Sequence, residues 1–248
     1  MKNNYSFNSF SIVVPIFNEQ AIFLDSASKI YKMASNTNLK FEIIFSENGS
    51  TDDTKKIVSK FIQNKKECSL ISLKKPDYGE ALKQGFKKAK NEVIVSFDID
   101  YYSEEFLNTA LCLDKKFSAV LASKRLKESE DDRSIFRRFI SKSFVLILKI
   151  IFRTKLSDTH GMKAIKQESL IRHLHKTISN QWMFDTELLL RIEGDGSLIK
   201  EVPIEVKEIR PSVYSLSSDI PKTILLIIRL RFKLLKEKFK TKSYPSMH

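Results

Sequence analysis

The sequence has few cysteines, glycines and prolines and no long apolar run, and each shortage excludes a class of protein. Its 248 residues include only Cys68 and Cys112, which excludes a disulfide scaffold and a cysteine-based zinc site and suits a reducing compartment. Six glycines and six prolines exclude collagen-like or low-complexity character. No stretch approaches the roughly 20 apolar residues of a membrane span, and residues 10–14 run into Pro15 without a signal-peptide core. We therefore expect a cytoplasmic protein with no transmembrane span.

The composition supports a folded core and an uneven surface charge. Hydrophobic residues make up 42% of the chain, which is enough to bury a core. The net charge of +13 is concentrated in residues 133–180 and 221–248, while the remainder is close to neutral. Such basic segments attract nucleic acid, anionic lipid or phosphate ligands.

The first half alternates predicted strands with predicted helices. Strands are expected at residues 10–14, 41–45, 69–73 and 92–97, and helices at 20–34, 54–61 and 79–89. This order predicts an α/β fold, with a mostly parallel sheet that is flanked by helices. Ligands of such sheets bind beyond the carboxyl ends of the strands.

The second half has a less regular pattern. Strands are expected at residues 119–123, 197–201 and 204–209, a loop at 157–161, and helices at 133–152, 169–175, 185–192 and 220–240. We expect one domain over 1–220, with a basic interface helix at about 133–155, followed by a basic amphipathic C-terminal helix or tail at 221–248.

Two acids at the end of a hydrophobic strand give the sharpest chemical signal. Asp98 and Asp100 follow the apolar residues 93–97 and are separated by Ile99. If the chain bends there, both carboxylates can hold Mg²⁺ or Mn²⁺, which bridges to a diphosphate. The alternative is a pair of solvated loop acids.

Two more polar segments follow predicted strands. In residues 46–54 (SENGSTDDT), Glu47 and Asn48 can hydrogen-bond a base or a ribose, and Gly49 permits a tight turn. Taken alone, residues 50–52 of this segment are a helix cap. Residues 14–19 (VPIFNE) join a strand to a polar pair.

In combination these motifs resemble family 2 glycosyltransferases of the GT-A fold. The resemblance rests on V-P-x-x-N-E, x-x-G-S-T-D-x-T, the glycine of 77–82 and F-D-x-D, in that order, and it covers residues 10–125 closely. It implies metal binding by Asp98 and Asp100. It also implies a nucleotide site that contains Pro15, Asn18, Glu19, Glu47, Asn48, Gly79, Asp98 and Arg210.

The second half resembles the dolichyl-phosphate mannose synthase and polyprenyl-phosphate glycosyltransferase branch. The residues concerned are 122–125 (ASKR), Arg137 with Ser141, 158–163 (DTHGMK), 182–190 (WMFDTELLL) and 210–215 (RPSVYS). The resemblance implies catalytic roles for Asp100, Arg125, Arg137 and Ser141. It implies acceptor contacts for Arg137, Ser141, His160 and Gly161.

The chain also departs from the family pattern. Glu47 and Asn48 replace the usual D-D before G-S, and Tyr102 stands where this branch often has Gln near the metal. Val213 takes roughly the place of the glycine in the closing R-x-x-G-x-S-K loop.

Both basic segments have the pattern of helices at a membrane surface. Residues 133–155 and 221–248 combine apolar positions with flanking Lys and Arg. We expect peripheral attachment to an anionic membrane at the inner face of the cell membrane, and no nucleic-acid binding. The alternative for 133–155 is a core helix with solvated ends.

The leading hypothesis is an inverting glycosyltransferase that moves mannose or glucose from GDP-mannose or UDP-glucose to a polyprenyl or dolichyl phosphate. Such a phosphate needs no general base. A family 2 enzyme that extends a glycan or glycolipid hydroxyl would need one, and Asp185 or Glu187 is then the candidate. A third hypothesis is a non-catalytic basic module that binds membrane or nucleic acid.

Overall fold

The computed structural model describes residues 5–206 and 216–243. In them the chain forms two compact units. The first unit contains the strands β1 (Ser9–Ile16), β2 (Lys40–Glu47), β3 (Cys68–Ser72), β4 (Val93–Ser96), β5 (Phe117–Ser123), β6 (Glu130–Asp131), β7 (Lys163–Lys166), β8 (Leu198–Pro203) and β9 (Glu205–Val206). Its helices are α1 (Phe23–Asn36), α2 (Thr54–Ile62), α3 (Tyr78–Lys88), α4 (Glu104–Leu111), α6 (Gln167–Leu174) and α7 (Met183–Gly194). The second unit contains α5 (Ile135–Phe152) and α8 (Leu216–Ser243).

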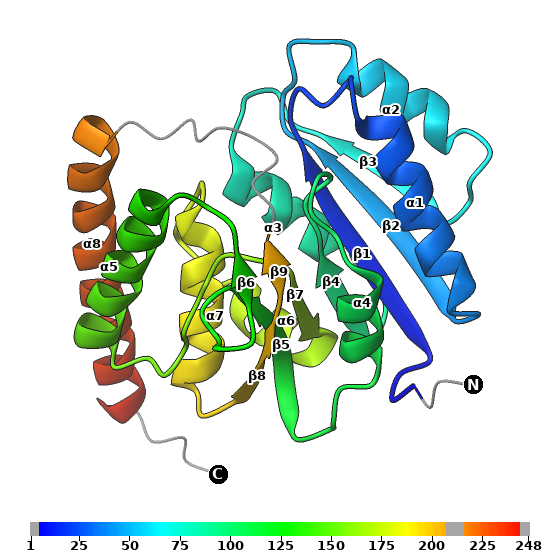
Figure 1. The fold of residues 1–248 in the computed structure, drawn as a ribbon. Coiled ribbons are helices and arrows are strands. Elements are labelled where there is room, and N and C mark those ends of the chain that lie inside the picture. Colours follow the sequence, from blue (N-terminus) through cyan, green and yellow to red (C-terminus); the bar gives the residue numbers. More distant parts are fainter. Residues whose placement is uncertain (1–4, 207–215, 244–248) are drawn as a thin grey trace. The chain divides into compact units, whose positions relative to one another are not determined.

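The first unit is built on a seven-stranded sheet in the order β3-β2-β1-β4-β7-β5-β8 (Figure 1). Its neighbouring strands are parallel except at β7, which runs antiparallel to both β4 and β5. The chain runs outward from β1 to β2 and β3, and then returns to place β4 on the other side of β1. Strand order therefore reverses beside β1, and the crevice at such a reversal is where open α/β sheets bind ligands.

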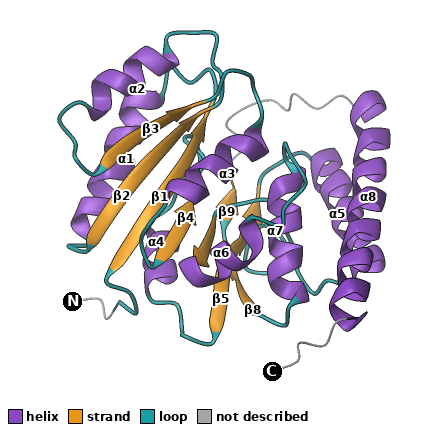
Figure 2. Ribbon diagram, turned by 180° about the vertical axis from the view of Figure 1, so that it is seen from behind, coloured by secondary structure: helices purple, strands orange, loops and turns teal. Residues whose placement is uncertain are grey.

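A hydrophobic core covers each face of the sheet because side chains of the central strands alternate in direction. Ile12 and Val14 of β1 pack with Phe23 of α1 and Phe106 of α4. Val13 points the other way and joins the core that contains residues of α3, α6 and α7. Figure 2 shows these three helices on the face seen from behind. Central strands of this kind are buried on both faces, which explains their nearly continuous apolar sequence.

Pro15 shapes the carboxyl edge of the sheet. The pairing of β1 with β4 ends at Val13 and Ser96, while β1 continues beside β2 as far as Ile16 and Glu47. Proline has no N–H to donate to a neighbouring strand. The two strands thus separate at Pro15, and the loop that follows β4 leaves the sheet at this point.

The second unit consists of helices that bury one side and expose the other. On α5, Val145 and Leu148 are buried, and on α8, Ile227 and Leu230 are buried. The side chain of Ser134 caps α5 by accepting a hydrogen bond from the Arg137 N–H.

The structure confirms the predicted α/β class with its mostly parallel sheet, and adds elements that the pattern did not indicate. Strand β7, strand β6 and helix α4 were not predicted. The strand expected at 204–209 is β9, which covers Glu205–Val206, and residues 207–209 lie outside the described residues. Residues 133–155, expected as an interface helix of a 1–220 domain, group with the helix expected in 221–248.

Candidate active site

The loops after β1 and β2 are joined side by side at the carboxyl edge of the sheet. The side-chain oxygen of Asn18, which has a positive φ of 54°, accepts a hydrogen bond from the Thr51 N–H at 2.9 Å. The backbone N–H of Glu19 donates to Thr54 Oγ1 at 2.8 Å. Asn18 and Glu19 therefore hold the first wall of the candidate nucleotide site.

The buried side chain of Glu47 holds the end of β2 in place through hydrogen bonds. Its side chain is 1% exposed. One carboxylate oxygen accepts a hydrogen bond from the Ser50 N–H, and the other accepts one from Ser72 Oγ at 2.6 Å. Each oxygen accepts one hydrogen bond from the protein, so Glu47 shapes the loop. Its contact with the nucleoside stays a prediction.

Asn48 and Gly79 connect this wall to the start of α3. Asn48 Oδ1 accepts a hydrogen bond from the Asp77 N–H at 2.6 Å, and Asp77 caps α3. A Cβ at Gly79 would lie 2.6 Å from the carbonyl oxygen of Gln181. Glycine at this position thus lets α3 approach the segment before α7, which is a packing requirement independent of any nucleotide.

Asp98 and Asp100 lie on a tight turn that leaves the carboxyl end of β4. The backbone N–H of Tyr101 donates to the Asp98 carbonyl at 3.0 Å, and the Asp98 N–H donates to the Tyr101 carbonyl at 3.2 Å. The chain therefore bends directly after β4, as the metal-binding hypothesis requires. Asp98 and Asp100 are both half-buried residues.

Because the Asp98 carboxyl is shielded from water, its negative charge is unfavourable unless a cation lies nearby. Desolvation raises the pKa of Asp98 to about 6, although the nearby Lys163 ammonium acts in the opposite direction. The negative charges of Asp100 and Asp185 raise it further. Such a carboxylate would be stabilised by a cation.

A buried polar cluster lies next to Asp98. Lys163 of β7 is 1% exposed and forms an ion pair with Asp185 of α7 at 3.0 Å. The Tyr78 hydroxyl lies 3.4 Å from both Asp98 Oδ1 and Asp185 Oδ2. Burial, followed by the charges of Asp185 and Asp98, raises the pKa of Tyr78 well above its ordinary value. Tyr78 is therefore a neutral hydrogen-bond donor between the two acids.

The two candidate bases occupy different environments. Asp185 Oδ1 is buried and has no hydrogen-bond partner in the described part of the chain. Glu187 is fully buried, and its carboxylate accepts hydrogen bonds from the Ile178 and Ser179 N–H groups and from Arg191 Nε at 2.7 Å. Glu187 thus stabilises the segment before α7, whereas Asp185 faces the Asp98 cluster.

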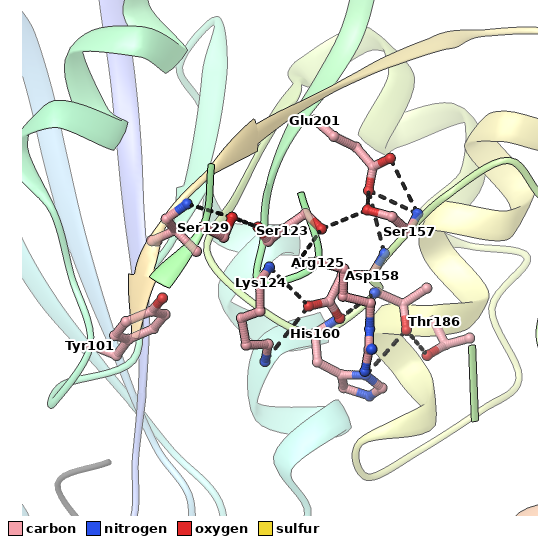
Figure 3. A network of polar contacts seen from close by, with 12 residues as sticks. Tyr101, Ser123, Lys124, Arg125, Ser129, Ser157, Asp158, His160, Thr186 and Glu201 are labelled. Atoms are coloured by element: carbon pink, nitrogen blue, oxygen red, sulfur yellow. Dashed lines mark hydrogen bonds and ion pairs between the residues drawn. The ribbon is translucent and has the colours of Figure 1, made fainter. Parts of the chain in front are cut away.

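A polar network holds the expected acceptor loop, residues 157–161, against β5 and β8. Glu201 of β8 accepts hydrogen bonds from the Ser157 N–H and hydroxyl, and Asp158 Oδ1 accepts one from the His160 N–H at 3.1 Å (Figure 3). Lys124 Nζ lies 3.8 Å from Asp158. A Cβ at Gly161 would lie 2.7 Å from the Ala122 carbonyl oxygen, so this loop packs directly on β5.

His160 is held between Trp182 and Thr159 by contacts at both ring nitrogens. Its Nε2–H donates to the Trp182 carbonyl at 3.1 Å, and its Nδ1 lies 3.1 Å from Thr159 Oγ1. Burial lowers the pKa of His160. The ring therefore links the loop to the start of α7.

A cavity of about 460 Å³ adjoins the Asp98 turn on the α4 side of the sheet. Tyr101 and Tyr102 form one wall, and Met162, Val202 and Ile204 contribute apolar side chains. Tyr102, noted above as a departure from the family pattern, thus lines this cavity.

The remaining predicted residues lie in different parts of the chain. Arg125 lies two residues after the end of β5, and its N–H donates to Ser123 Oγ at 3.2 Å. Arg137 and Ser141 belong to α5 in the second unit. Arg210 lies outside the described residues. The structure thus brings together the residues at the ends of β1, β2 and β4, and the roles of Arg125, Arg137, Ser141 and Arg210 stay predictions.

Two residues of the Asp98 cluster were missed by sequence reasoning. Tyr78 precedes Gly79 in the motif at residues 77–82, and Lys163 is the last residue of the motif at 158–163. Both residues therefore belong to motifs that carry the family resemblance. The signal that could have identified Lys163 is its position between apolar residues (MKAI), together with an acid such as Asp185 that could pair with it. Such a lysine is buried only when it is paired.

Comparison with solved structures identifies the fold of this protein. The glucosyl-3-phosphoglycerate synthase of Mycobacterium tuberculosis with UDP aligns with a TM-score of 0.65 at 19% identity, over 91% of this chain and 80% of that one. The mannosyltransferase PcManGT of Pyrobaculum calidifontis, with GDP-Man and Mn²⁺, aligns with a TM-score of 0.62 at 20% identity, over 86% and 60%. The fold is that of GT-A glycosyltransferases.

Residues 11–174 match the family model described as Glycosyl transferase family 2, and the chain belongs to that family. It is similar to the dolichyl-phosphate beta-glucosyltransferase of Dictyostelium discoideum, with 27% identity over 251 residues that cover 94% of this chain and 77% of the relative. The human enzyme of the same description is 25% identical over 221 residues, which cover 82% and 68%. The predicted family and enzyme class are confirmed.

None of the helices in residues 5–206 and 216–243 combines the length and apolarity needed to cross a bilayer.

Proposed function

We propose that this protein transfers a hexose from a nucleotide sugar to a polyprenyl or dolichyl phosphate, with inversion at the sugar carbon C1. The observation that carries the proposal is the pair Asp98 and Asp100 on a tight turn beside the reversal of strand order. The dolichyl-phosphate glucosyltransferases among the relatives support the lipid phosphate acceptor.

Asp98 and Asp100 would hold a divalent cation, either Mg²⁺ or Mn²⁺. No group of three or more His, Cys, Asp or Glu that could hold a metal occurs among the described residues. The protein would therefore supply two carboxylates, and diphosphate oxygens and water would supply the remaining ligands. Oxygen donors suit both ions, and the raised pKa of Asp98 favours a neighbouring cation. When bound, the ion would neutralise charge on the leaving diphosphate. Mn²⁺ in the PcManGT structure supports this proposal.

The loops after β1 and β2 would hold the nucleoside, with Asn18, Glu19 and Asn48 as its wall. Glucose from UDP-glucose has more support than mannose from GDP-mannose, because relatives of this chain include dolichyl-phosphate beta-glucosyltransferases. PcManGT resembles this chain in fold alone, so mannose stays the second choice.

The acceptor phosphate would attack C1 directly. Its second pKa is about 6, so near pH 7 it is largely a dianion and needs no general base. A bond forms between a phosphate oxygen and C1, the bond from C1 to the nucleoside diphosphate breaks, and the diphosphate leaves. Arg125, Arg137 and Ser141 are proposed to bind the acceptor phosphate or the diphosphate. Arg210 is proposed to bind the nucleotide, and His160 and Gly161 to contact the acceptor.

The helices of the second unit are proposed to contact the inner face of an anionic membrane. On α5, Ile135, Phe139 and Ile150 are 84%, 65% and 71% exposed and recur along one side of the helix. On α8, Leu225 and Phe232 are 67% and 61% exposed. Basic residues flank these apolar positions: Arg138, Lys142, Lys149, Arg153, Arg229, Lys233 and Lys236. This is the composition of a helix that lies in a membrane interface.

A second candidate function is transfer to a glycan or glycolipid hydroxyl. The unpartnered Oδ1 of Asp185 favours it, because such an oxygen can accept a proton. The other carboxylate oxygen of Asp185 is paired with the Lys163 ammonium at 3.0 Å.

The experiment offers UDP-glucose and GDP-mannose with Mn²⁺ to two acceptors, a short polyprenyl phosphate and the matching polyprenol, in anionic vesicles. Product formation on the phosphate alone is expected, and Asp100→Asn should abolish it. Product on the alcohol would favour the second candidate function. Nucleotide sugar that binds to neither wild type nor variant, while vesicles or DNA bind, would indicate a non-catalytic basic module.

A further inference from the structure

The carboxylate of Glu201 accepts hydrogen bonds from three donors at the start of the expected acceptor loop, residues 157–161. These donors are the Ser157 N–H at 2.9 Å, the Ser157 hydroxyl at 2.7 Å and the Asp158 N–H at 3.3 Å. Asp158 is 4% exposed, and a buried N–H without an acceptor costs free energy. Glu201 belongs to β8, which is the last strand of the sheet, so its side chain ties the loop to the sheet edge.

The rest of the loop is held by Asp158. Its Oδ1 accepts hydrogen bonds from the Thr159 N–H at 2.8 Å and from the His160 N–H at 3.1 Å. The chain then reaches Lys163, the first residue of β7, which forms the buried ion pair of the Asp98 cluster. The loop is therefore anchored at both ends, by the carboxylate on β8 and by this ion pair.

The direction of the hydrogen bonds around Ser157 is fixed by Glu201. An ionised carboxylate can only accept, so the Ser157 hydroxyl donates its single hydrogen to Glu201. Ser123 Oγ lies 2.6 Å from Ser157 Oγ, and Ser123 must therefore be the donor of that pair. The oxygen of Ser123 in turn accepts a hydrogen bond from the Arg125 N–H at 3.2 Å (Figure 3). A single chain of hydrogen bonds thus connects Glu201 to the backbone of Arg125.

The two segments that meet at Glu201 are those proposed above for the acceptor. Arg125 lies on one of them, and His160 and Gly161 lie on the other. The nucleotide wall at the ends of β1 and β2 is farther along the sheet, because β4, β7 and β5 lie between β1 and β8. A change at Glu201 should therefore disturb the acceptor side and leave the nucleotide side intact.

We propose that Glu201 is a positioning residue for the lipid phosphate acceptor, and that it holds the acceptor loop and the backbone of Arg125 in the arrangement that receives the phosphate. The proposal rests on the proposed function and adds to it a residue that acts through the loop without touching the substrate. Hydrogen bonds to a charged acceptor are stronger than those to a neutral one, which suits a carboxylate to this role. Glu201→Gln keeps one accepting oxygen, whereas Glu201→Ala removes both.

The test uses full-length wild type, Glu201→Gln, Glu201→Ala and the control Glu168→Gln. Transfer from UDP-glucose, or from GDP-mannose if wild type uses that donor, is measured against the concentration of a short polyprenyl phosphate in anionic vesicles with Mn²⁺. Calorimetry measures the affinity for UDP or GDP, and the melting temperature checks that each variant folds. Glu168 is exposed in the first turn of α6, so the control removes the same charge away from the loop.

We expect the apparent KM for polyprenyl phosphate to rise about tenfold in Glu201→Ala and about threefold in Glu201→Gln, because the amide keeps part of the contact. Nucleotide affinity should stay within about twofold of wild type in both variants, since the nucleotide wall is distant. Amide hydrogen exchange at residues 157–158, followed by mass spectrometry, should become faster in both variants. Glu168→Gln should match wild type in every measurement.

An unchanged acceptor KM in Glu201→Ala would overturn the role of Glu201. An equal loss of nucleotide affinity and acceptor affinity would also overturn it, because Glu201 would then support the fold as a whole. If Glu201→Ala does not fold, Glu201→Gln decides between these outcomes. If wild type transfers sugar to polyprenyl phosphate from neither donor, the proposed function itself fails.

Discussion

Replacing Lys163 should show how much the buried ion pair beside Asp98 contributes to the free energy of unfolding. Lys163 and Asp185 are 1% and 2% exposed, and their charged atoms lie 3.0 Å apart. Lys163→Met removes the cation and leaves a buried carboxylate next to Asp98. Removing one partner of a buried pair costs about 3–5 kcal/mol, so we expect a loss of roughly 4 kcal/mol in the free energy of unfolding. For a chain of this size the melting temperature should fall by roughly 10 °C.

The assay is urea unfolding followed by circular dichroism, with the exposed Lys200→Met as the matched control. Lys200 lies on β8 of the same sheet and should change stability by less than about 0.5 kcal/mol. The double variant Lys163→Met/Asp185→Asn removes both charges and should recover about 1–3 kcal/mol of the loss. The reasoning is refuted if Lys163→Met unfolds with the wild-type midpoint, or if the double variant loses the sum of both single losses.

Three further predictions concern stability. Gly79→Ala places a Cβ 2.6 Å from the Gln181 carbonyl oxygen and should cost about 1–3 kcal/mol, while Gly194→Ala meets no atom within 4 Å and should change stability by less than about 1 kcal/mol; equal urea midpoints would argue against the close approach. Glu187→Gln should cost about 3 kcal/mol, because a neutral amide cannot balance the buried arginine that Glu187 pairs with; a variant as stable as wild type in thermal unfolding would show that the pair is unimportant. Burial lowers the pKa of His173 below its ordinary 6.5, so the unfolded chain takes up this proton first and stability should fall as the pH drops below about 6.5; His173→Gln should lose less stability than wild type between pH 7.5 and 5.5, and an equal loss would contradict the shift.

Local patterns predicted the central strands and the candidate metal turn well. Strands β1, β2 and β4 each contain a short apolar run, IVV, IIF and VIV, and such a run can be recognised as a buried strand without knowledge of its distant contacts. The Asp98–Asp100 spacing is also local. The bend that it requires forms within the turn itself, between Asp98 and Tyr101. Motif order then sufficed to predict the GT-A fold.

Features that depend on distant partners could not be predicted from the sequence. Strand β7 reads Lys-Ala-Ile-Lys, and lysine at both ends argues for a surface segment. Lys163 is buried because Asp185 of α7 pairs with it, and Lys166 is buried with its ammonium donating to the Lys115 carbonyl. Likewise, Glu47 accepts a hydrogen bond from Ser72 of β3, a partner that no local pattern around Glu47 indicates. In each case a hydrogen bond or ion pair with a residue distant in the sequence determines where the side chain lies.

Direct detection of Mn²⁺ at the Asp98 turn tests the central claim most sharply. Electron paramagnetic resonance of free and bound Mn²⁺ would be recorded with the full-length protein and UDP or GDP. The account predicts that the nucleotide promotes tight Mn²⁺ binding in wild type, that Asp98→Asn and Asp100→Asn each abolish it, and that Asp114→Asn, which alters an exposed acid ahead of β5, leaves it unchanged. Mn²⁺ that binds equally well to wild type and to both turn variants would contradict the account.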